Sequence, residues 1–416
     1  METRFDAIVI GAGPAGSSAA ILLAEAGWRV ALVEKQAYPR RKVCGECISA
    51  TNLPLLEALG IGNAIEPLAG GALRQVALVC GARIVRAPLP PYGDPIHPWG
   101  LAIGREHLDT LLLEQARYRG VSIFQPWQVC SIAGTPGNFH CRLRQADGGE
   151  ERLLPVSLVI DAHGSWEPPV PQDGRPDAPR CSRHRSSDLF AFKANFANAA
   201  LEAGLLPVFS FPGGYGGMVI GGGASATFAF CIRRDALTRA RSRFPGMKPA
   251  EAAHGWVRQH CSAAARLFGG AVQLGKWLGA GPIRPGIHLG GRYDGLFRVG
   301  NAAGEAHPII GEGISMALQS AVLLAGTLVG DGLPRADGQA QARLHAEYVQ
   351  GWRRHFARRI RLAALYAQLA MRPHIVSGGL PALERNPALL TRFARWSGKV
   401  RPGPGIARNG RATEYA

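Results

Sequence analysis

The stretch "FDAIVIGAGPAG" at residues 5–16 decides the fold of this 416-residue chain. It starts with a short apolar run of β type and continues into three closely spaced glycines. A helical pattern follows, and a second apolar run, "RVALVE", ends at Glu34. Strand, glycine turn, helix, strand and acid in this order predict a βαβ unit that binds a dinucleotide, with the acid placed to bond a ribose hydroxyl.

Each glycine of the motif has its own physical role. Gly11 permits the tight turn, Gly13 lets the backbone approach a pyrophosphate, and Gly16 lets the helix pack closely on the strand. The diphosphate is expected at the positive end of the helix that begins at Pro14. Pro14 and Ala15 in the variable positions, with the motif at the extreme amino terminus, favour FAD over NAD.

The length predicts two domains, or one large α/β domain with an insertion. A hydrophobic fraction of 47% and a charged fraction of 19% are those of a globular chain, not a disordered one. The net charge of +17 suits nucleic acid, an anionic membrane or anionic ligands, but no nucleic-acid-binding motif accompanies it, so no such partner is expected. The densest basic run, "GWRRHFARRIRLAALYAQLAMR" at 351–372, is either a solvated helix face or a face that docks on a membrane.

Three observations bear on where the protein resides. The glycine motif begins at Gly11, so no cleavable signal is expected before it. The apolar run at 313–330 contains Gln319 and two serines, which predicts a buried helix rather than a membrane span. The eight scattered cysteines are then expected to be reduced thiols. We therefore expect a cytoplasmic protein, with peripheral membrane association as an open alternative.

Three further segments are expected to contact the cofactor. Residues 103–124 show a helical pattern followed by a strand, and Arg105 at the start of the helix is placed to reach an anionic cofactor. Residues 154–169 predict a strand that runs into a turn at Asp161. Residues 295–313 predict a strand, a glycine-rich loop and the start of a helix, whose positive end would stabilise negative charge on a ligand.

In these segments the chain resembles the FAD-dependent monooxygenases of the para-hydroxybenzoate hydroxylase fold. The stretch "PRRKVCGECIS" at 39–49 is similar to the branch that contains geranylgeranyl reductases, flavin-dependent halogenases and polyketide-modifying flavoprotein oxidoreductases. The resemblance covers roughly residues 1–335. Its motifs are specific to the fold and not to one reaction.

The resemblance implies an α/β fold with three parts. These are a Rossmann-like FAD-binding domain of the para-hydroxybenzoate hydroxylase and glutathione reductase type, an inserted antiparallel β-sheet substrate domain, and carboxy-terminal helices. The FAD-binding domain is expected to be discontinuous, over 1–75, 100–185 and 280–335. The substrate-binding sheet is expected over 76–99 and 186–279, and a helical region with a flexible tail over 336–416.

The resemblance also implies which residues contact FAD. They are Gly11, Gly13, Pro14, Ala15, Gly16, Glu34, Lys35, Arg41, Lys42, Val43, Cys44, Arg105, Val129, Asp161, Gly300, Asn301, Pro308, Gly311, Glu312, Gly313 and Ile314. Asn301 stands where these relatives usually carry an aspartate. An amide keeps one carbonyl acceptor and adds donors, so FAD is still expected to bind.

Two residues are candidates for catalysis. By the resemblance Cys44 lies beside the isoalloxazine ring, where it either takes part in the chemistry or only packs. Cys44 and Cys47 also have the spacing of a redox disulfide, whereas zinc would need a second ligand pair, so no metal is expected. His307, inside the flavin loop, is the best candidate to handle a proton, and a hydrogen bond that braces the loop is the alternative.

The turn Asp161-Ala162-His163-Gly164 departs from the Asp-Gly that the hydroxylases carry at this place. In those relatives the turn touches both FAD and the nicotinamide donor. The expected electron donor is therefore either NAD(P)H or a separate flavin reductase.

Residues 186–232 are predicted to form antiparallel strands separated by glycine turns. In the resembling fold such a sheet covers the substrate side of the flavin. The expected substrate contacts are Phe192, Phe209, Phe211, Tyr215 and Met218, and packing in a core is the alternative for most of them. The scarcity of charge suggests a small apolar or aromatic substrate, free or linked to a carrier or lipid.

The resemblance thus implies an FAD-dependent oxidoreductase with three reactions open. The first is monooxygenation of an apolar aromatic or polyketide-type molecule through a flavin C4a-hydroperoxide. The alternative is reduction or dehydrogenation of an alkene or isoprenoid-like substrate. Halogenation is less favoured, because the chain lacks the Trp-x-Trp-x-Ile-Pro stretch that halogenases commonly carry. The oligomeric state stays open.

Overall fold

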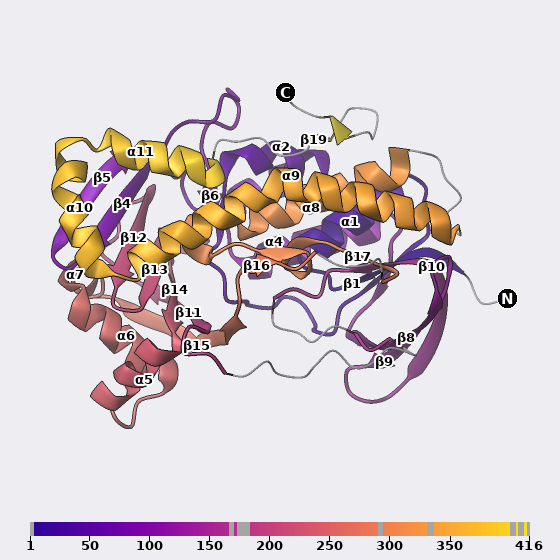
Figure 1. Cartoon of the computed structure of the whole chain (residues 1–416), viewed down its shortest axis with the longest axis horizontal. Helices are drawn as coiled ribbons and strands as arrows, with labels where there is room; N and C mark the ends of the chain where they lie inside the picture. The colour runs from indigo at the N-terminus through magenta and orange to yellow at the C-terminus, as the bar shows by residue number, and fades with distance from the viewer. Residues whose placement is uncertain are drawn as a thin grey trace.

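The computed structural model describes residues 4–165, 170–172, 184–289, 294–330 and 337–399, together with two short strands near the carboxyl end. It contains two seven-stranded β-sheets, and the long helix α9 extends from the region of the first sheet to that of the second (Figure 1). The helices α10 and α11 lie beside β4 and β5 of the second sheet (Figure 1).

The first sheet is built around a long central strand, β10. Its order is β7-β2-β1-β10-β9-β8, and β17 also pairs with β10. The strand bounds are β1 Phe5–Ile10, β2 Val30–Val33, β7 Ser122–Phe124, β8 Trp127–Thr135, β9 Asn138–Gln145, β10 Glu151–Asp161 and β17 Leu296–Arg298. The first half of β10 pairs antiparallel with β9, and the second half pairs parallel with β1 and β17. The carboxyl ends of β1, β2, β10 and β17 therefore meet at one edge, where sheets of this kind bind ligands.

Helices α1, α4 and α8 belong to the same core as this sheet. The helix bounds in this region are α1 Pro14–Glu25, α2 Leu53–Ala58, α3 Gly62–Ile65, α4 Arg105–Tyr118 and α8 Gly313–Gly330. Helix α1 packs against both α4 and α8. Within the described ranges, α8 is the one helix long and apolar enough to cross a membrane, and 67% of it is buried inside the protein. That degree of burial is the packing of a core helix.

The second sheet has the order β15-β11-β14-β13-β12-β4-β5. Its bounds are β4 Gln75–Cys80, β5 Arg83–Pro88, β11 Leu189–Ala197, β12 Leu205–Phe211, β13 Gly214–Ile220, β14 Ala226–Arg233 and β15 Val272–Ile283. The helices α5 Arg234–Arg243, α6 Pro249–His260 and α7 Ser262–Leu267 pack against it. One pair departs from the predicted antiparallel sheet, because β12 runs parallel to β4. The two strands come from distant parts of the chain and are joined by a long crossover, which a parallel pair requires.

Two short ladders fix the loops near the carboxyl edge of the first sheet. Strand β3 (Cys47–Ile48) pairs with β6 (Leu101–Ala102), and β16 (Gly286–Ile287) pairs with β18 (Gly304–Glu305). Both ladders are antiparallel. They hold the segment after β2 and the loop before α8 in place.

The carboxy-terminal helices are α9 Gly338–Ala370, α10 Pro373–Arg385 and α11 Ala388–Ala394. The predicted basic run lies on α9 and is not a uniformly solvated face. Arg359 is buried and donates to Gln319 of α8 at 2.9 Å, and Arg353 donates to the carbonyl of Leu289 at 2.8 Å. The tail expected to be flexible lies outside the described residues, apart from Gly405–Ile406 and Ala412–Thr413, which pair with each other.

A buried ion pair joins the segment after β2 to the second sheet. Glu46 follows β2 and has a φ of 59°, which is uncommon for a residue with a side chain. Its carboxylate pairs with Nζ of Lys193 on β11 and accepts a hydrogen bond from Oγ1 of Thr227 on β14 at 2.6 Å. It also accepts from the backbone N–H of Arg105 at 3.2 Å. Glu46 is 2% exposed and Lys193 is 0% exposed, so water cannot replace either partner.

Replacing Lys193 with methionine is expected to destabilise the fold by about 3–5 kcal/mol, because the buried Glu46 carboxylate loses its counter-charge. The double variant Lys193→Met/Glu46→Gln removes both charges and should recover much of that loss. Urea unfolding followed by circular dichroism measures the midpoints. The control is Arg86→Ala, which removes an exposed pair with Glu202 and should shift the midpoint little. Equal midpoints for Lys193→Met and Arg86→Ala would contradict the role given to the buried pair.

Candidate active site

A cavity of about 580 Å³ runs between the two sheets. One end is bounded by the glycine turn after β1 and by the loop before α8. The other end lies against α9, α10 and α11 and the strands β4, β12 and β13. The volume is within the range of sites that hold organic ligands. The cavity therefore joins the edge expected to bind the cofactor to the sheet expected to bind the substrate.

The glycine turn leaves its backbone open to the cavity. Gly11 has a φ of +102°, and a Cβ there would lie 2.6 Å from the carbonyl oxygen of Ala162, so only glycine fits. A Cβ at Gly16 would collide with the carbonyl oxygen of Gly11, which is why helix and strand pack so closely. A Cβ at Gly13 would meet nothing nearer than Nη2 of Arg105 at 3.6 Å, so a phosphate has room there. The first N–H groups of α1 face that space and favour an anion.

Glu34 lies beside this turn, at the carboxyl end of β2. Its carboxylate accepts the backbone N–H groups of Ala12 and Gln36, each at 3.0 Å, and the hydroxyl of Tyr38 at 3.3 Å. The side chain is buried and in the position where a ribose hydroxyl of a dinucleotide binds. The turn, the helix end and this acid together fit the adenosine diphosphate half of FAD.

Most of the predicted FAD contacts do lie around the cavity. Those that line it are Gly13, Pro14, Ala15, Lys42, Val43, Cys44, Arg105, Gly300, Asn301, Pro308, Gly311, Gly313 and Ile314. Arg105 is buried and donates two hydrogen bonds of 2.7 Å to Asp109, one turn later on α4, which holds the guanidinium in place. Gly311 has a φ of +63° and allows the loop to turn into α8, whose amino-terminal end opens on the cavity.

Three predicted FAD contacts lie elsewhere. Lys35 has an exposed side chain outside the lining of the cavity. Arg41 is also exposed and donates to Oδ1 of Asn195 on β11 at 2.7 Å, so it braces the second sheet. Val129 is packed in the core behind the first sheet and pairs with Leu143 of β9. Strand register and local turns thus place these three side chains outside the lining of the cavity.

Two predicted carboxylate contacts also point away from the cavity. Asp161 ends β10, accepts a short hydrogen bond from Nδ1 of His163, and lies 3.9 Å from Nε of Arg298. Glu312 is buried, and Ser49 donates to it. Both acids belong to the loops that surround the site and lie outside the lining of the cavity.

Asn301 does face the cavity, and its amide has two partners. Nδ2 donates to Oγ of Ser165 at 2.6 Å and to Oε1 of Glu305 at 3.2 Å. Ser165 in turn donates to the same Glu305 oxygen at 3.0 Å. Both amide hydrogens are therefore used, and the carbonyl oxygen of Asn301 is what remains to accept a hydroxyl of the cofactor.

Glu305 is a site residue that sequence reasoning missed. It lines the cavity, and its Oε2 has no hydrogen-bond partner among the described residues. Burial raises the pKa of this carboxyl from its ordinary value of 4.5 to about 7, while the Ser165 hydrogen bond and the charge of Lys42 hold it lower. An acid inside an otherwise small and apolar glycine loop was the available signal.

Cys44 lines the cavity, and its thiol accepts the backbone N–H of Glu46 at 3.3 Å. Cys44 and Cys47 are both free thiols in this structure. His307 is outside the lining; its Nδ1 lies 3.2 Å from the hydroxyl of Tyr215, which does line the cavity. Burial lowers the pKa of His307 to about 4. This geometry fits the alternative role, a hydrogen bond that braces the loop.

The predicted substrate residues divide between two faces of the second sheet. Of the five, Tyr215 lines the cavity. Phe192, Phe209, Phe211 and Met218 lie in the core on the opposite face, with side chains from α6 and α7. Because side chains alternate along a strand, the face toward the cavity carries smaller side chains instead. Those from this sheet include Val76, Val208, Gly217, Val219, Ala229 and Cys231.

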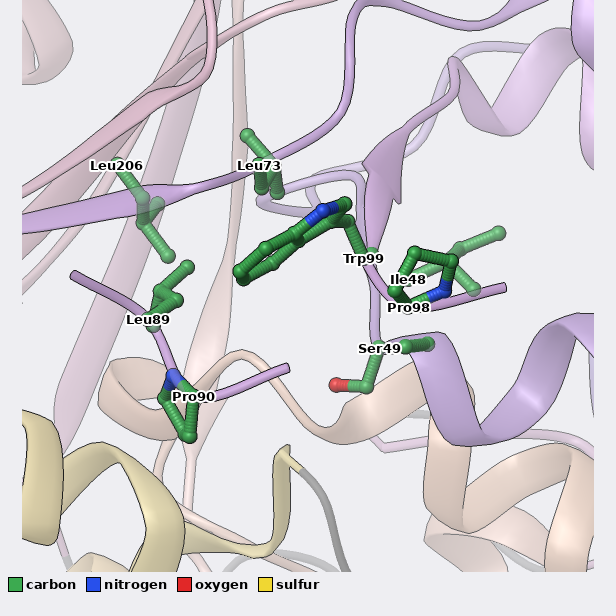
Figure 2. Close-up of a pocket in the computed structure, with 10 residues that line it drawn as sticks. Ile48, Ser49, Leu73, Leu89, Pro90, Pro98, Trp99 and Leu206 are labelled. Atoms are coloured by element: carbon green, nitrogen blue, oxygen red, sulfur yellow. The ribbon is translucent and has the colours of Figure 1, made fainter. Parts of the chain in front are cut away.

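A small pocket of about 20 Å³ adjoins the apolar part of the cavity and shares Leu89 and Leu206 with it. Figure 2 shows the indole of Trp99 in the middle of this group, close to Leu73. Its described lining is almost entirely aliphatic or aromatic. The cavity wall is therefore apolar on this side as well.

At a pH well above 7, where Glu305 is ionised, the substitution Asn301→Asp is expected to weaken FAD binding by about 10-fold or more, because two carboxylates would then lie against each other beside the cofactor. The exchange Asn301→Asp/Glu305→Gln restores one carboxylate and one amide and should recover most of the affinity. Quenching of FAD fluorescence on adding apoprotein measures the dissociation constants. Asn138→Asp, which adds a charge at an exposed position of β9, is the matched control. If the double variant binds FAD no better than Asn301→Asp alone, the interaction between Asn301 and Glu305 is refuted.

The apoprotein should lose stability as the pH rises through about 7, because ionisation of buried Glu305 is unfavourable in the folded state. With a folded pKa raised above the unfolded value, the stabilisation is complete below pH 4.5 and is lost toward pH 8, by roughly 3 kcal/mol at most. Glu305→Gln should remove this loss. Thermal melting of both apoproteins from pH 5 to 8.5 tests it, and a difference between them that does not change with pH would exclude the buried, near-neutral carboxyl.

Comparison with known proteins agrees with this geometry. A family profile described as "FAD binding domain" matches residues 4–268. The chain is 26% identical over 428 residues to a menaquinone reductase of Mycolicibacterium smegmatis, which covers 96% of this chain and 93% of that protein. It is 29% identical over 161 residues to a tryptophan 2-halogenase of Chondromyces crocatus, which covers 38% of this chain and 30% of that protein.

Solved structures show the same architecture. The myxobacterial chondrochloren halogenase CndH is similar with a TM-score of 0.71 at 19% identity, over 99% of both chains. PqsL of Pseudomonas aeruginosa, in complex with 2-aminobenzoylacetate, is similar with a TM-score of 0.67 at 18% identity, over 91% of this chain and 100% of that chain. At such identities these likenesses establish the fold alone, and they confirm the predicted α/β arrangement. With the match over residues 4–268 and the cavity edge that fits FAD, the chain belongs to the FAD-binding-domain family and is an FAD-dependent oxidoreductase.

Proposed function

We propose that the protein is a monooxygenase that hydroxylates an apolar aromatic or polyketide-type molecule carrying an aliphatic part. The observation that supports this proposal most is the continuity of the cavity. It leads from the edge of the first sheet that fits FAD, the cofactor edge, to the end of the cavity bounded by the second sheet and the carboxy-terminal helices. We call this second end the chamber. FAD, when bound at that edge, supplies the redox chemistry and the reaction with oxygen.

The walls of the chamber decide the class of substrate. Side chains there include Leu78, Leu206, Val208, Val219 and Leu383. A polar molecule would leave its hydrogen-bonding groups unpaired against such walls, at a cost of about 1–3 kcal/mol for each group. An aliphatic chain instead gains up to about 0.8 kcal/mol for each buried methylene. The same walls keep water away from the reacting atoms.

Proton transfer would occur where the chamber meets the cofactor edge. Burial raises the pKa of the Cys231 thiol to about 12 and that of Tyr215 well above its ordinary value, so both stay neutral. Glu305 has a pKa near 7 and lines the same space, which suits it to accept a phenolic proton. The role that the sequence suggested for His307 passes to this carboxyl.

The electron donor is proposed to be NAD(P)H or a separate flavin reductase. Ala162, Gly164 and Ser165, from the turn after β10, line the cavity beside the cofactor edge. The substrate is proposed to be a small molecule, free or linked to a lipid or carrier.

A second candidate is reduction or dehydrogenation of a carbon–carbon double bond in an isoprenoid-like chain. Two observations favour it. The menaquinone reductase matches in sequence over almost the whole of both chains, unlike the tryptophan 2-halogenase, and Cys44 lies on the cavity wall. The apolar chamber suits such a chain equally well, so the reaction with oxygen must separate the two.

Anaerobically reduced holoprotein should, on mixing with oxygenated buffer, show a transient absorbance species before the oxidised spectrum returns. With a long-chain alkylphenol present, hydroxylated product should form, because the chamber holds the chain and Glu305 takes the phenolic proton. Stopped-flow absorbance and mass spectrometry of the product measure both. Direct return to the oxidised spectrum with only peroxide formed, together with turnover of an isoprenoid alkene, would favour the second candidate instead.

Two adjacent glycines of α10 allow a matched test of where the alkyl chain of the substrate binds. Gly379 lines the cavity, whereas Gly378 does not, and a Cβ at either meets no atom within 4 Å. Gly379→Trp should therefore remove the preference for long-chain over short-chain alkylphenols. Gly378→Trp should leave that preference unchanged.

A further inference from the structure

The apolar chamber opens at the carboxy-terminal helices. Leu369 of α9, Ile375 of α10 and Phe393 of α11 all line the cavity. The same three side chains are 39%, 44% and 38% exposed, respectively. A residue that both lines a cavity and reaches solvent marks its opening. These residues therefore form a mouth for the chamber on the side away from the cofactor edge.

Further large apolar side chains surround this mouth. Leu365 is 56% exposed and Trp396 is 58% exposed, although neither lines the cavity. The ring of Phe393 lies 5.9 Å from that of Trp396 and 6.0 Å from that of Tyr366, so the aromatic rings are contiguous. We call Leu365, Leu369, Ile375, Phe393 and Trp396 the mouth patch. Contiguous exposed apolar side chains of this kind mark an interaction site.

The segment that carries the mouth patch, residues 351–399, is strongly basic. Between positions 351 and 399 the only acidic residue is Glu384, and Nε of Arg83 donates to it at 2.9 Å. Basic residues in the same interval stand at 353, 354, 358, 359, 361, 372, 385, 392, 395 and 399. Arg361, Arg392 and Arg395 are exposed, and no acidic side chain pairs with them within the described part of the chain.

We propose that the mouth patch and its arginines dock the protein on an anionic lipid bilayer, and that the apolar substrate enters the chamber from the bilayer. Aromatic and aliphatic side chains enter the boundary between headgroups and acyl chains, while arginines contact anionic headgroups. A substrate with an aliphatic chain partitions into the same layer. The inference rests on the proposed function in one respect only, because it requires that the substrate is apolar.

Other occupants of the patch fit the charges less well. A second copy related by two-fold symmetry would place arginines against arginines. The described strands of the tail, Gly405–Ile406 and Ala412–Thr413, make their main contacts with α2 and α8. An apolar patch with exposed, unpaired arginines beside it matches an anionic bilayer surface, which supplies both the apolar layer and the counter-charge.

The test is co-sedimentation of the holoprotein with vesicles of phosphatidylcholine alone or mixed with phosphatidylglycerol. Strong binding is expected only to the mixed vesicles, and it should weaken as salt rises. Leu365→Ser/Trp396→Ser and, separately, Arg392→Glu/Arg395→Glu should each lower the partition coefficient by at least about 10-fold. The matched control is Arg241→Glu/Arg243→Glu, a charge reversal of the same size at exposed positions of α5, which should bind as the wild type does.

The FAD absorbance spectrum of each variant shows whether it is folded, because none of the replaced side chains lines the cavity. Three results would overturn the inference: no binding to mixed vesicles, equal binding to both vesicle types, or an equal loss in the α5 control. A wild-type dimer that Trp396→Ser converts to a monomer would assign the patch to a second copy instead. Turnover of a short, water-soluble alkylphenol without vesicle binding would support the proposed function and contradict membrane docking. Vesicle binding without such turnover would support membrane docking and contradict the proposed function.

Discussion

The buried Glu46 carboxylate is the constraint on which the rest of the structure depends. It belongs to the segment after β2, yet its partners lie on β11 and β14 of the other sheet. A carboxylate and an ammonium without water must stay in contact, since separating them inside the protein leaves an uncompensated charge. The second sheet is thereby held against this segment and the start of α4, at the place where Glu46 also lines the cavity. The backbone at Glu46 is in the left-handed region, which is unfavourable for a residue with a side chain, and the contacts of its carboxylate hold it there.

The chemistry at the cofactor edge follows from where carboxyl groups are charged. Asn301 presents a neutral amide at a position next to the expected diphosphate, and the nearby carboxyl, Glu305, has its charge suppressed by burial. The local field is therefore less negative than two carboxylates would make it, while a hydrogen-bond acceptor is kept. The same burial that reduces repulsion toward phosphates places a titratable group near pH 7 at the junction with the substrate chamber. One packing arrangement thus affects both cofactor binding and proton transfer.

The sequence was most informative where a local pattern has one structural solution. The glycine turn, the strand before it and the acid after β2 could all be predicted, because few backbones accommodate that order of residues. Strand alternation was less informative. A period of two shows which side chains share a face but not which face is the cavity, so Phe209 and Phe211 were expected at the substrate and lie in the core. Arg41 and Glu305 could not be placed, since their partners Asn195 and Ser165 are distant in the sequence and only tertiary structure brings them together.

The cofactor edge and the far wall of the chamber are built by different parts of the chain, so different residues specify the reaction and the substrate. The motifs that resemble other flavoproteins end before α9, and they build the cofactor edge. The far wall of the chamber comes from α9, α10 and α11, which carry no cofactor motif. Helix α9 connects the two parts physically, because its inward Arg359 bonds to α8, whereas its last turns carry Leu365 and Leu369 outward to the mouth. Substitutions in the last two helices can therefore change which molecule enters without disturbing the flavin site, and relatives that share the first part need not share a substrate.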